Sequence, residues 1–192
     1  MNTNDSLEVK NNRAKKMMLW FGMISMSMTF AGLTSAYVVS SSRSDWIQQI
    51  ELPFAFTLST LLIIFSSGSF YGALKMIQSQ KIKAAQGLLM LTLAIAIGFI
   101  YFQFQGFAAI IDQGYYFTGP ESSITTSYLY VLVLLHLLHF TAGIVIVLNV
   151  FFKTLKGKYL DGNTLGFELA VTFWHFLDLL WVYLFLFVSF YG

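Results

Sequence analysis

Five long apolar stretches divide the chain, and short polar segments separate them. Hydrophobic residues continue through each stretch without the strict alternation of a β-strand, which argues against a β-barrel. An α-helix needs about 20 residues to cross the roughly 30 Å core of a bilayer. The pattern therefore predicts an all-α fold, a polytopic membrane bundle of five transmembrane helices. The predicted spans are Met17–Ser41, Leu52–Ile77, Ala85–Ile111, Ser127–Phe152 and Leu165–Tyr191.

Composition agrees with a membrane protein. Hydrophobic residues make up 57% of the 192 residues and charged residues only 10%, whereas soluble domains have about 25% charged residues. The formal net charge is +2, and the basic residues fall into short clusters, so we expect no nucleic-acid partner. The chain has no cysteine, which excludes disulfides, iron–sulfur clusters and thiolate-ligated copper or zinc.

The basic residues are distributed unevenly over the polar segments. Arg43 alone falls between the first and second spans, and no basic residue falls between the third and fourth. The other ten lie on the opposite side of the expected membrane: Lys10, Arg13, Lys15, Lys16, Lys75, Lys81, Lys83, Lys153, Lys156 and Lys158. Cytoplasmic segments are enriched in Lys and Arg, so we expect the N-terminus inside and the C-terminus outside. The connections Ser44–Leu52 and Gln113–Thr126 would then also lie outside.

The same pattern predicts a simple domain organisation. Residues 1–16 are expected to form a cytoplasmic N-terminal tail, and residues 17–192 a single five-helix transmembrane domain. Gly32, Gly68, Gly98 and Gly143 lie within the spans, with serine or alanine nearby. Small residues let helix backbones approach closely in a membrane, so we expect these glycines at helix contacts.

Ionisable residues inside the predicted spans are the candidate functional groups. They are costly in lipid and normally face the bundle interior. His136 and His139 are i,i+3 neighbours on the fourth helix. On the fifth, Glu168 and His175 lie about 20° apart, and Asp178 about 80° from Glu168. His175 and Asp178 can touch, whereas Glu168 needs a partner on another helix, a lipid headgroup or water. We expect the fourth and fifth helices to pack with these faces together.

Three interpretations of these residues remain open from the residues alone. They can form interhelical hydrogen bonds that fix the packing. They can form a metal or haem site from three imidazoles and two carboxylates, for which the His-x-x-His spacing is a weak indication. They can also form the proton or ion relay of a transporter.

The last span carries a specific pattern. FELAVTFWHFLDLLWVYLFLFVSFYG, Phe167 to Gly192, has a glutamate, four residues, and then aromatic-Trp-His-Phe-x-Asp-x-x-Trp. This resembles the last helix of cytochrome c oxidase subunit III, in the shorter five-helix bacterial form. FAGLTSAY and STLLIIFSS resemble the family's first two helices, and Gln105 falls on a glutamine of the third. The remaining matches are Glu168, Phe173, Trp174, His175, Phe176, Asp178 and Trp181, and on the fourth span His136, His139 and Gly143.

The resemblance implies an accessory, cofactor-free subunit of a haem-copper oxidase in an aerobic respiratory chain of the bacterial cytoplasmic membrane. Such a subunit has no active site of its own. It stabilises the catalytic subunit, binds phospholipid in a cleft between helices and supports proton uptake. Haem and copper are expected in the partners, the catalytic subunit I and the copper-carrying subunit II. A small extra subunit and other respiratory complexes are further candidate partners.

The residue inventory agrees with this role. Six histidines hold the haems and copper of the catalytic subunit, and this chain has three. The copper-carrying subunit needs two cysteines, and this chain has none. The residues expected to tie the helices together or to line a lipid- or water-containing cleft are His136, His139, Glu168, Trp174, His175, Asp178 and Trp181. The alternative function is a small proton-coupled transporter that uses Glu168 and the histidines as its relay.

Two positions depart from the family pattern. Met26 and Ala108 stand where the family usually has glutamates, one in the first span and one in the third. A role that depends on either acid is therefore not expected here. Glu168 is the only glutamate left within the predicted spans.

Overall fold

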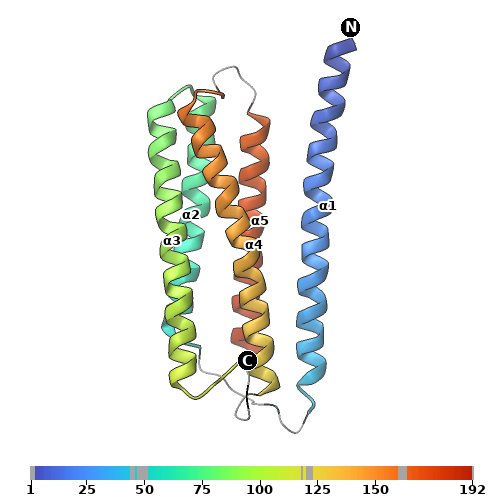
Figure 1. The fold of residues 1–192 in the computed structure, drawn as a ribbon, viewed down its shortest axis with the longest axis vertical. Coiled ribbons are helices and arrows are strands. Elements are labelled where there is room, and N and C mark those ends of the chain that lie inside the picture. Colours follow the sequence, from blue (N-terminus) through green and yellow to red (C-terminus); the bar gives the residue numbers. More distant parts are fainter. Residues whose placement is uncertain are drawn as a thin grey trace.

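The computed structural model confirms the five predicted helices (Figure 1). It describes residues 3–43, 46, 52–117, 119, 123–159 and 164–191, without the side chains of 3–6. All five helices are long and apolar enough to cross a membrane. Their bounds are α1 Thr3–Ser40, α2 Phe54–Gln78, α3 Ile82–Asp112, α4 Ile124–Leu155 and α5 Leu165–Tyr191.

Helix α1 is longer than the predicted span. The polar segment predicted as a tail is helical from Thr3 onward and runs into the span without a break. The helix lies to one side of the other four (Figure 1) and, within the described residues, contacts only α4 and α5. Met23 packs against Phe173 and Leu177 of α5, and Phe30 packs among leucines of α4 and α5. Much of the remaining surface of α1 is uncovered.

Aromatic side chains fill the core between α2, α3, α4 and α5. The Phe99 and Phe140 rings lie 4.6 Å apart between centroids, and the Phe99 and Trp181 rings lie 5.2 Å apart. Phe140 also lies 5.0 Å from Trp174, so ring contacts connect α3, α4 and α5 in one chain. Edge-to-face and offset arrangements of this kind each add about 0.5–1.5 kcal/mol beyond the area they bury.

Only some of the glycines lie at helix contacts. A Cβ at Gly143 would lie 2.7 Å from Leu177 and 3.3 Å from Trp174, so α4 and α5 approach closely there. At Gly98 the nearest atom, of Leu62, would be 3.6 Å away, an ordinary contact. A Cβ at Gly32 or Gly68 would meet no atom within 4 Å, so these two glycines lie at no close helix contact within the described part of the chain. Both lie on faces of their helices that the rest of the chain does not cover.

The turn that ends α4 folds the chain back over the last helical turn. Gly157 has a φ of 68°, a conformation that glycine adopts without a steric penalty. The Lys158 N–H donates to the Lys153 carbonyl at 3.1 Å, and the Gly157 N–H donates to the Thr154 carbonyl at 3.1 Å. These two bonds form a Schellman motif, which satisfies carbonyls left open at the helix end. Lys158 is thereby held beside Lys153.

The order of the helices gathers most of the basic residues at one end of the bundle. The start of α1, the ends of α2 and α4 and the starts of α3 and α5 lie at one end, here called the basic end, and the C-terminal end of α5 lies at the other (Figure 1). All the basic residues except Arg43 belong to the basic end. Most of the connection 44–52, and part of 113–126, lie outside the described residues.

Candidate functional site

Two tryptophans attach α5 to α2. The Trp174 indole N–H donates to the Ser66 hydroxyl at 2.7 Å, and the Trp181 indole N–H donates to the Thr60 hydroxyl at 3.0 Å. The two indoles share one face of α5 because seven residues make almost two full turns. All four side chains are buried, so each donor has a partner that water or lipid could not supply.

His175 and Asp178 lie beside this contact between α5 and α2, but they do not form the expected pair with each other. His175 Nδ1 lies 2.6 Å from the Ser67 hydroxyl of α2. The same hydroxyl lies near the Asp178 carboxyl group, yet neither carboxyl oxygen has a hydrogen-bond partner among the described residues. Asp178 is only 4% exposed. Ser67 thus contacts His175 and lies near Asp178, and no hydrogen bond joins His175 to Asp178 among the described residues.

Glu168 has a local partner. It lies in the first turn of α5, where its Oε1 accepts a hydrogen bond from the Thr164 hydroxyl at 2.9 Å. The Thr164 carbonyl in turn accepts the backbone N–H groups of Phe167 and Glu168. A carboxylate in the first turn is favoured by the helix dipole. Among the described residues the partner comes from the start of the same helix, and a contact with lipid or water stays a prediction.

The two histidines of α4 face different neighbours. His136 is completely buried, with the Trp181 ring 5.1 Å away and the Phe99 ring 6.3 Å away. Neither of its ring nitrogens has a hydrogen-bond partner among the described residues. His139 instead lies 5.8 Å from the Phe30 ring of α1, and its Nδ1 lies 2.8 Å from the Leu135 carbonyl.

The predicted packing of α4 and α5 is therefore only partly correct. The two helices are in contact, and His136 lies against Trp181 of α5. However, His139 turns to α1, while His175 is bonded to α2. The i,i+3 spacing placed these residues on adjacent positions of a helix, but in a bundle adjacent positions face different neighbouring helices.

Sequence reasoning missed the polar residues that serve as partners. The Gln103 amide donates to the Ser59 hydroxyl at 2.7 Å, and both side chains are 0% exposed. Ser59 and Thr60, and then Ser66 and Ser67, form two hydroxyl pairs seven residues apart on α2. That repeat matches the seven-residue spacing of Trp174 and Trp181 and was the available signal. The exposed Gln105, which the family resemblance singled out, bonds only to Tyr101 at 2.8 Å.

The arrangement favours packing over metal binding. No three His, Cys, Asp or Glu side chains within the described part of the chain lie close enough together to hold a metal ion. His136 and His139 both lie near Phe30 of α1, whereas His175 contacts α2. His139 and His175 use Nδ1 for contacts within the bundle. The polar groups between α2 and α5 can fix helix positions, and they do not converge on one point.

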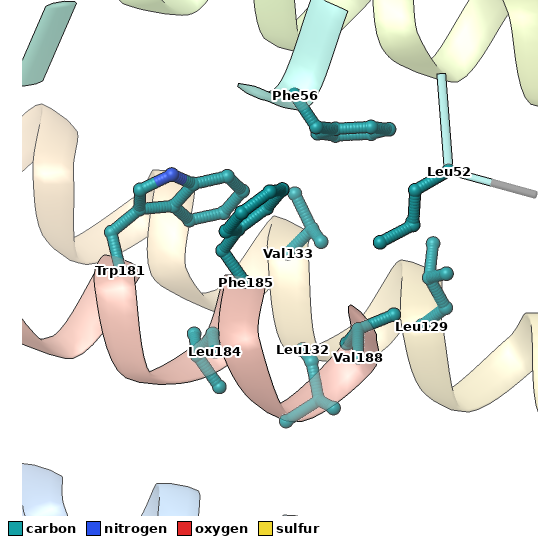
Figure 2. A pocket seen from close by; sticks show the side chains of 9 residues that line it. All are labelled: Leu52, Phe56, Leu129, Leu132, Val133, Trp181, Leu184, Phe185 and Val188. Atoms are coloured by element: carbon teal, nitrogen blue, oxygen red, sulfur yellow. The ribbon is translucent and has the colours of Figure 1, made fainter. Parts of the chain in front are cut away.

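The internal cavity beside Trp181 is small and apolar. It has a volume of about 20 Å³ and lies between α4, α5 and the start of α2. Figure 2 shows Trp181 and Phe185 projecting from α5 beneath Phe56, with Leu129 and Val133 of α4 opposite. A space of this size holds about one water molecule, and its lining offers no polar partner. It carries no chemistry of its own.

Comparisons with known proteins give a consistent result. A family model described as cytochrome c oxidase subunit III matches residues 16–192. Subunit 3 of a cytochrome bo(3) ubiquinol oxidase from Buchnera aphidicola is 26% identical over 98% of this chain and 92% of its own length. Cytochrome c oxidase subunit 3 from Bacillus sp. PS3 is 26% identical over 95% of this chain and 86% of its own length. Subunit 3 of the cytochrome bo(3) ubiquinol oxidase from Pseudomonas putida is 30% identical over 84% of this chain and 74% of its own length.

Proposed function

The chain belongs to the cytochrome c oxidase subunit III family, and we propose that it stabilises the catalytic subunit of its oxidase and carries no redox centre itself. It is an accessory subunit of a multi-subunit terminal oxidase and a multi-pass protein of the bacterial inner membrane. The observation that carries the proposal is the family match over residues 16–192. The site supports it, because Trp174, Trp181 and His175 of α5 form hydrogen-bond contacts with α2.

The transporter alternative has no support. The relatives are named as oxidase subunits. A relay would also need ionisable groups in sequence across the membrane. Glu168 instead bonds to Thr164 at the helix start, and His136 is enclosed by aromatic rings.

We assign the partners and residue roles as follows. Haem and copper reside in a catalytic subunit I, and further copper resides in a subunit II. Phospholipid, a small extra subunit or another respiratory complex covers the surfaces of this chain that those two subunits leave open. The uncovered face of α1, which exposes Met18, Trp20, Phe21 and Met28, is a surface for such contacts. Trp174 and Trp181 fix α5 on α2. His175 holds α5 against α2 through Ser67, His136 and His139 pack against aromatic rings of neighbouring helices, and Glu168 fixes the start of α5. Asp178 lines the contact between α5 and α2.

We also propose that the N-terminus is cytoplasmic and the C-terminus periplasmic. The basic residues gathered at one end of the bundle support this, because cytoplasmic segments are enriched in Lys and Arg. Alkaline phosphatase fused after Tyr191 should be active, and the same enzyme fused before Thr3 should be inactive. A fluorescent protein that folds only in the cytoplasm should give the opposite result. Activity of phosphatase at both ends would contradict the proposal.

The accessory role is tested by purification of the tagged chain from membranes. We expect it to co-purify with haem absorbance and oxygen-reducing activity, and the separated chain to have neither. Oxidase depleted of this chain should start at a similar rate per haem and lose activity faster during sustained turnover. Recovery of the chain without haem from membranes that contain assembled oxidase would overturn the proposal. Proton-coupled uptake by liposomes that contain the chain alone would overturn it as well.

A further inference from the structure

A layer of buried polar side chains crosses the core of the bundle in the half that is farther from the basic end. The Gln103 amide of α3 donates to the Ser59 hydroxyl of α2 at 2.7 Å. The Trp181 indole of α5 donates to the Thr60 hydroxyl of α2 at 3.0 Å, and the His136 ring of α4 lies 5.1 Å from the Trp181 ring. All five side chains are buried, and they are here called the polar layer. Each of the helices α2 to α5 contributes to it.

Three atoms of the polar layer have no hydrogen-bond partner among the described residues. They are Oε1 of Gln103 and both ring nitrogens of His136, and both side chains are 0% exposed. The Ser59 hydroxyl donates to the Phe56 carbonyl at 2.8 Å, so its oxygen accepts the bond from Gln103. This orients the amide with Nε2 toward α2 and leaves Oε1 to find a partner elsewhere. Unpaired polar atoms are unfavourable in a protein interior, so these three indicate a polar ligand in the core.

Ring contacts place Gln103 and His136 at nearly the same level of the bundle. The Phe99 ring of α3 lies 6.3 Å from the His136 ring, and the Phe107 ring of α3 lies 5.0 Å from the Tyr130 ring of α4. Gln103 is midway between these two phenylalanines, one helical turn from each. It therefore lies opposite the part of α4 between Tyr130 and His136, within about 5 Å of His136 along the helix axis. A small ligand between α3 and α4 can reach both side chains.

Water has the hydrogen-bonding groups that these atoms require. A neutral imidazole has one donor and one acceptor nitrogen. A water molecule can bond to either nitrogen of His136 and still has a hydrogen to donate to Oε1 of Gln103. A metal ion does not fit, because the polar layer has no carboxylate and only one imidazole.

Room for a water molecule exists next to the polar layer. The cavity of about 20 Å³ beside Trp181 is bordered by Phe56 of α2 and Val133 of α4 (Figure 2). Val133 is one turn from His136 on α4, so the cavity adjoins the layer. Its volume is about that of one water molecule. The core is therefore not fully packed at this level, and small side-chain shifts can open the same volume beside Gln103 and His136.

We propose that one internal water molecule binds in the polar layer and bridges Gln103 of α3 to His136 of α4. Direct hydrogen bonds at this level already join α3 and α5 to α2, through Ser59 and Thr60. The water adds α4 to the same set. Its effect is to fix the axial position of α4, which otherwise meets α3 through ring contacts. The proposal does not depend on the oxidase role, because it concerns the core of this chain alone.

The first test detects the water directly. The full chain is reconstituted in lipid bilayers with isotopically labelled histidine, and solid-state NMR measures magnetisation transfer from water to the imidazole rings. We expect transfer to the buried ring of His136, assigned by comparison with His139→Phe and His175→Phe. Gln103→Leu should abolish this transfer. The matched control Gln105→Leu removes an exposed glutamine of the same helix and should leave it unchanged. No transfer to His136 in the unmodified chain, or equal transfer in Gln103→Leu, would overturn the proposal.

A double-mutant cycle tests whether the two side chains share a partner. Unfolding by SDS in bicelles is followed by circular dichroism for Gln103→Leu, for His136→Phe and for the double variant. Each single substitution should raise the equilibrium constant for unfolding about tenfold. The two together should raise it by clearly less than about a hundredfold, because the second removes a group whose bridge is already lost.

The control cycle combines Gln105→Leu with His139→Phe, and these two effects should be independent. Independent effects of Gln103→Leu and His136→Phe would contradict the bridge. If His136→Phe does not refold, the NMR comparison of the unmodified chain with Gln103→Leu decides the question without it.

Discussion

Replacement of Trp174 by alanine should lower the free energy of unfolding by about 3–5 kcal/mol. The indole is 0% exposed, its ring centroid lies 5.0 Å from that of Phe140 and 6.0 Å from that of Phe70, and its N–H bonds to Ser66. Alanine would leave a cavity where α2, α4 and α5 meet and a buried hydroxyl without its donor. In lipid, helix association depends on such packing, because apolar side chains gain little from leaving hydrocarbon.

The contributions of shape and hydrogen bonding can be separated. Trp174→Phe keeps much of the ring volume and should cost about 1 kcal/mol through the lost bond to Ser66, in addition to a smaller void. Ser66→Ala combined with Trp174→Phe should cost less than the sum of the two. The measurement is reversible unfolding by SDS in bicelles, followed by circular dichroism. Trp20→Ala is the control, since that indole is 60% exposed. A loss at Trp20 as large as at Trp174 would contradict the assigned packing.

Gly143→Leu should separate α4 from α5. Already the first carbon of a side chain would lie 2.7 Å from Leu177 and 3.3 Å from the Trp174 ring. Alanine is tolerated only if Leu177 changes rotamer, whereas leucine also requires the Trp174 ring or the helix backbone to move. Overpacking of this kind costs about 1–3 kcal/mol, and more where backbone must shift. We therefore expect Gly143→Leu to be more damaging than Gly143→Ala.

Gly68→Ala is the matched control for Gly143→Ala. Nothing lies within 4 Å of the position of a Cβ at Gly68, so the added methyl group meets no obstacle. In the isolated chain it should stabilise α2 by up to about 1 kcal/mol through helix propensity. The same SDS titration measures both variants, and retention of the chain in the oxidase measures assembly. A Gly143→Ala variant as stable as Gly68→Ala would show that α4 and α5 are not in the close contact described here.

Hydropathy was sufficient to predict the number and position of the helices because each span must satisfy its own backbone hydrogen bonds in lipid. The hydrogen-bond partners of the side chains could not be predicted in the same way. Spacing placed His175 and Asp178 on one face of α5, but it did not show that His175 would contact Ser67 of α2. That information depends on how α2 and α5 are aligned along their axes. The paired hydroxyls on α2 indicated this alignment, because their seven-residue spacing matches that of Trp174 and Trp181. Serine and threonine are, however, too common in membrane helices for these pairs to be singled out.

The glycines also show that the sequence alone does not reveal which residues face another helix. Gly68 and Gly143 look alike in the sequence, each in an apolar helix, yet only Gly143 faces another helix of this chain. Which face of a helix is covered depends on the whole bundle, and helices of low amphipathicity give little indication of it. Glu168 shows a different limit. The predicted span Leu165–Tyr191 already placed Glu168 in the first turn of the helix, but it did not show that the Thr164 hydroxyl would donate to its carboxylate.

The contacts of α1 have a consequence for the synthesis of the protein. α2 and α3 are neighbours in both sequence and space and can pair as soon as α3 leaves the ribosome. α1 enters the membrane first, but its contacts within the described residues are only with α4 and α5. At about 5–20 residues per second, it must wait several seconds or more for the first of these helices. During nascent-chain insertion α1 is therefore a single helix in lipid, open to the translocon, to chaperones or to another oxidase subunit before its own bundle exists.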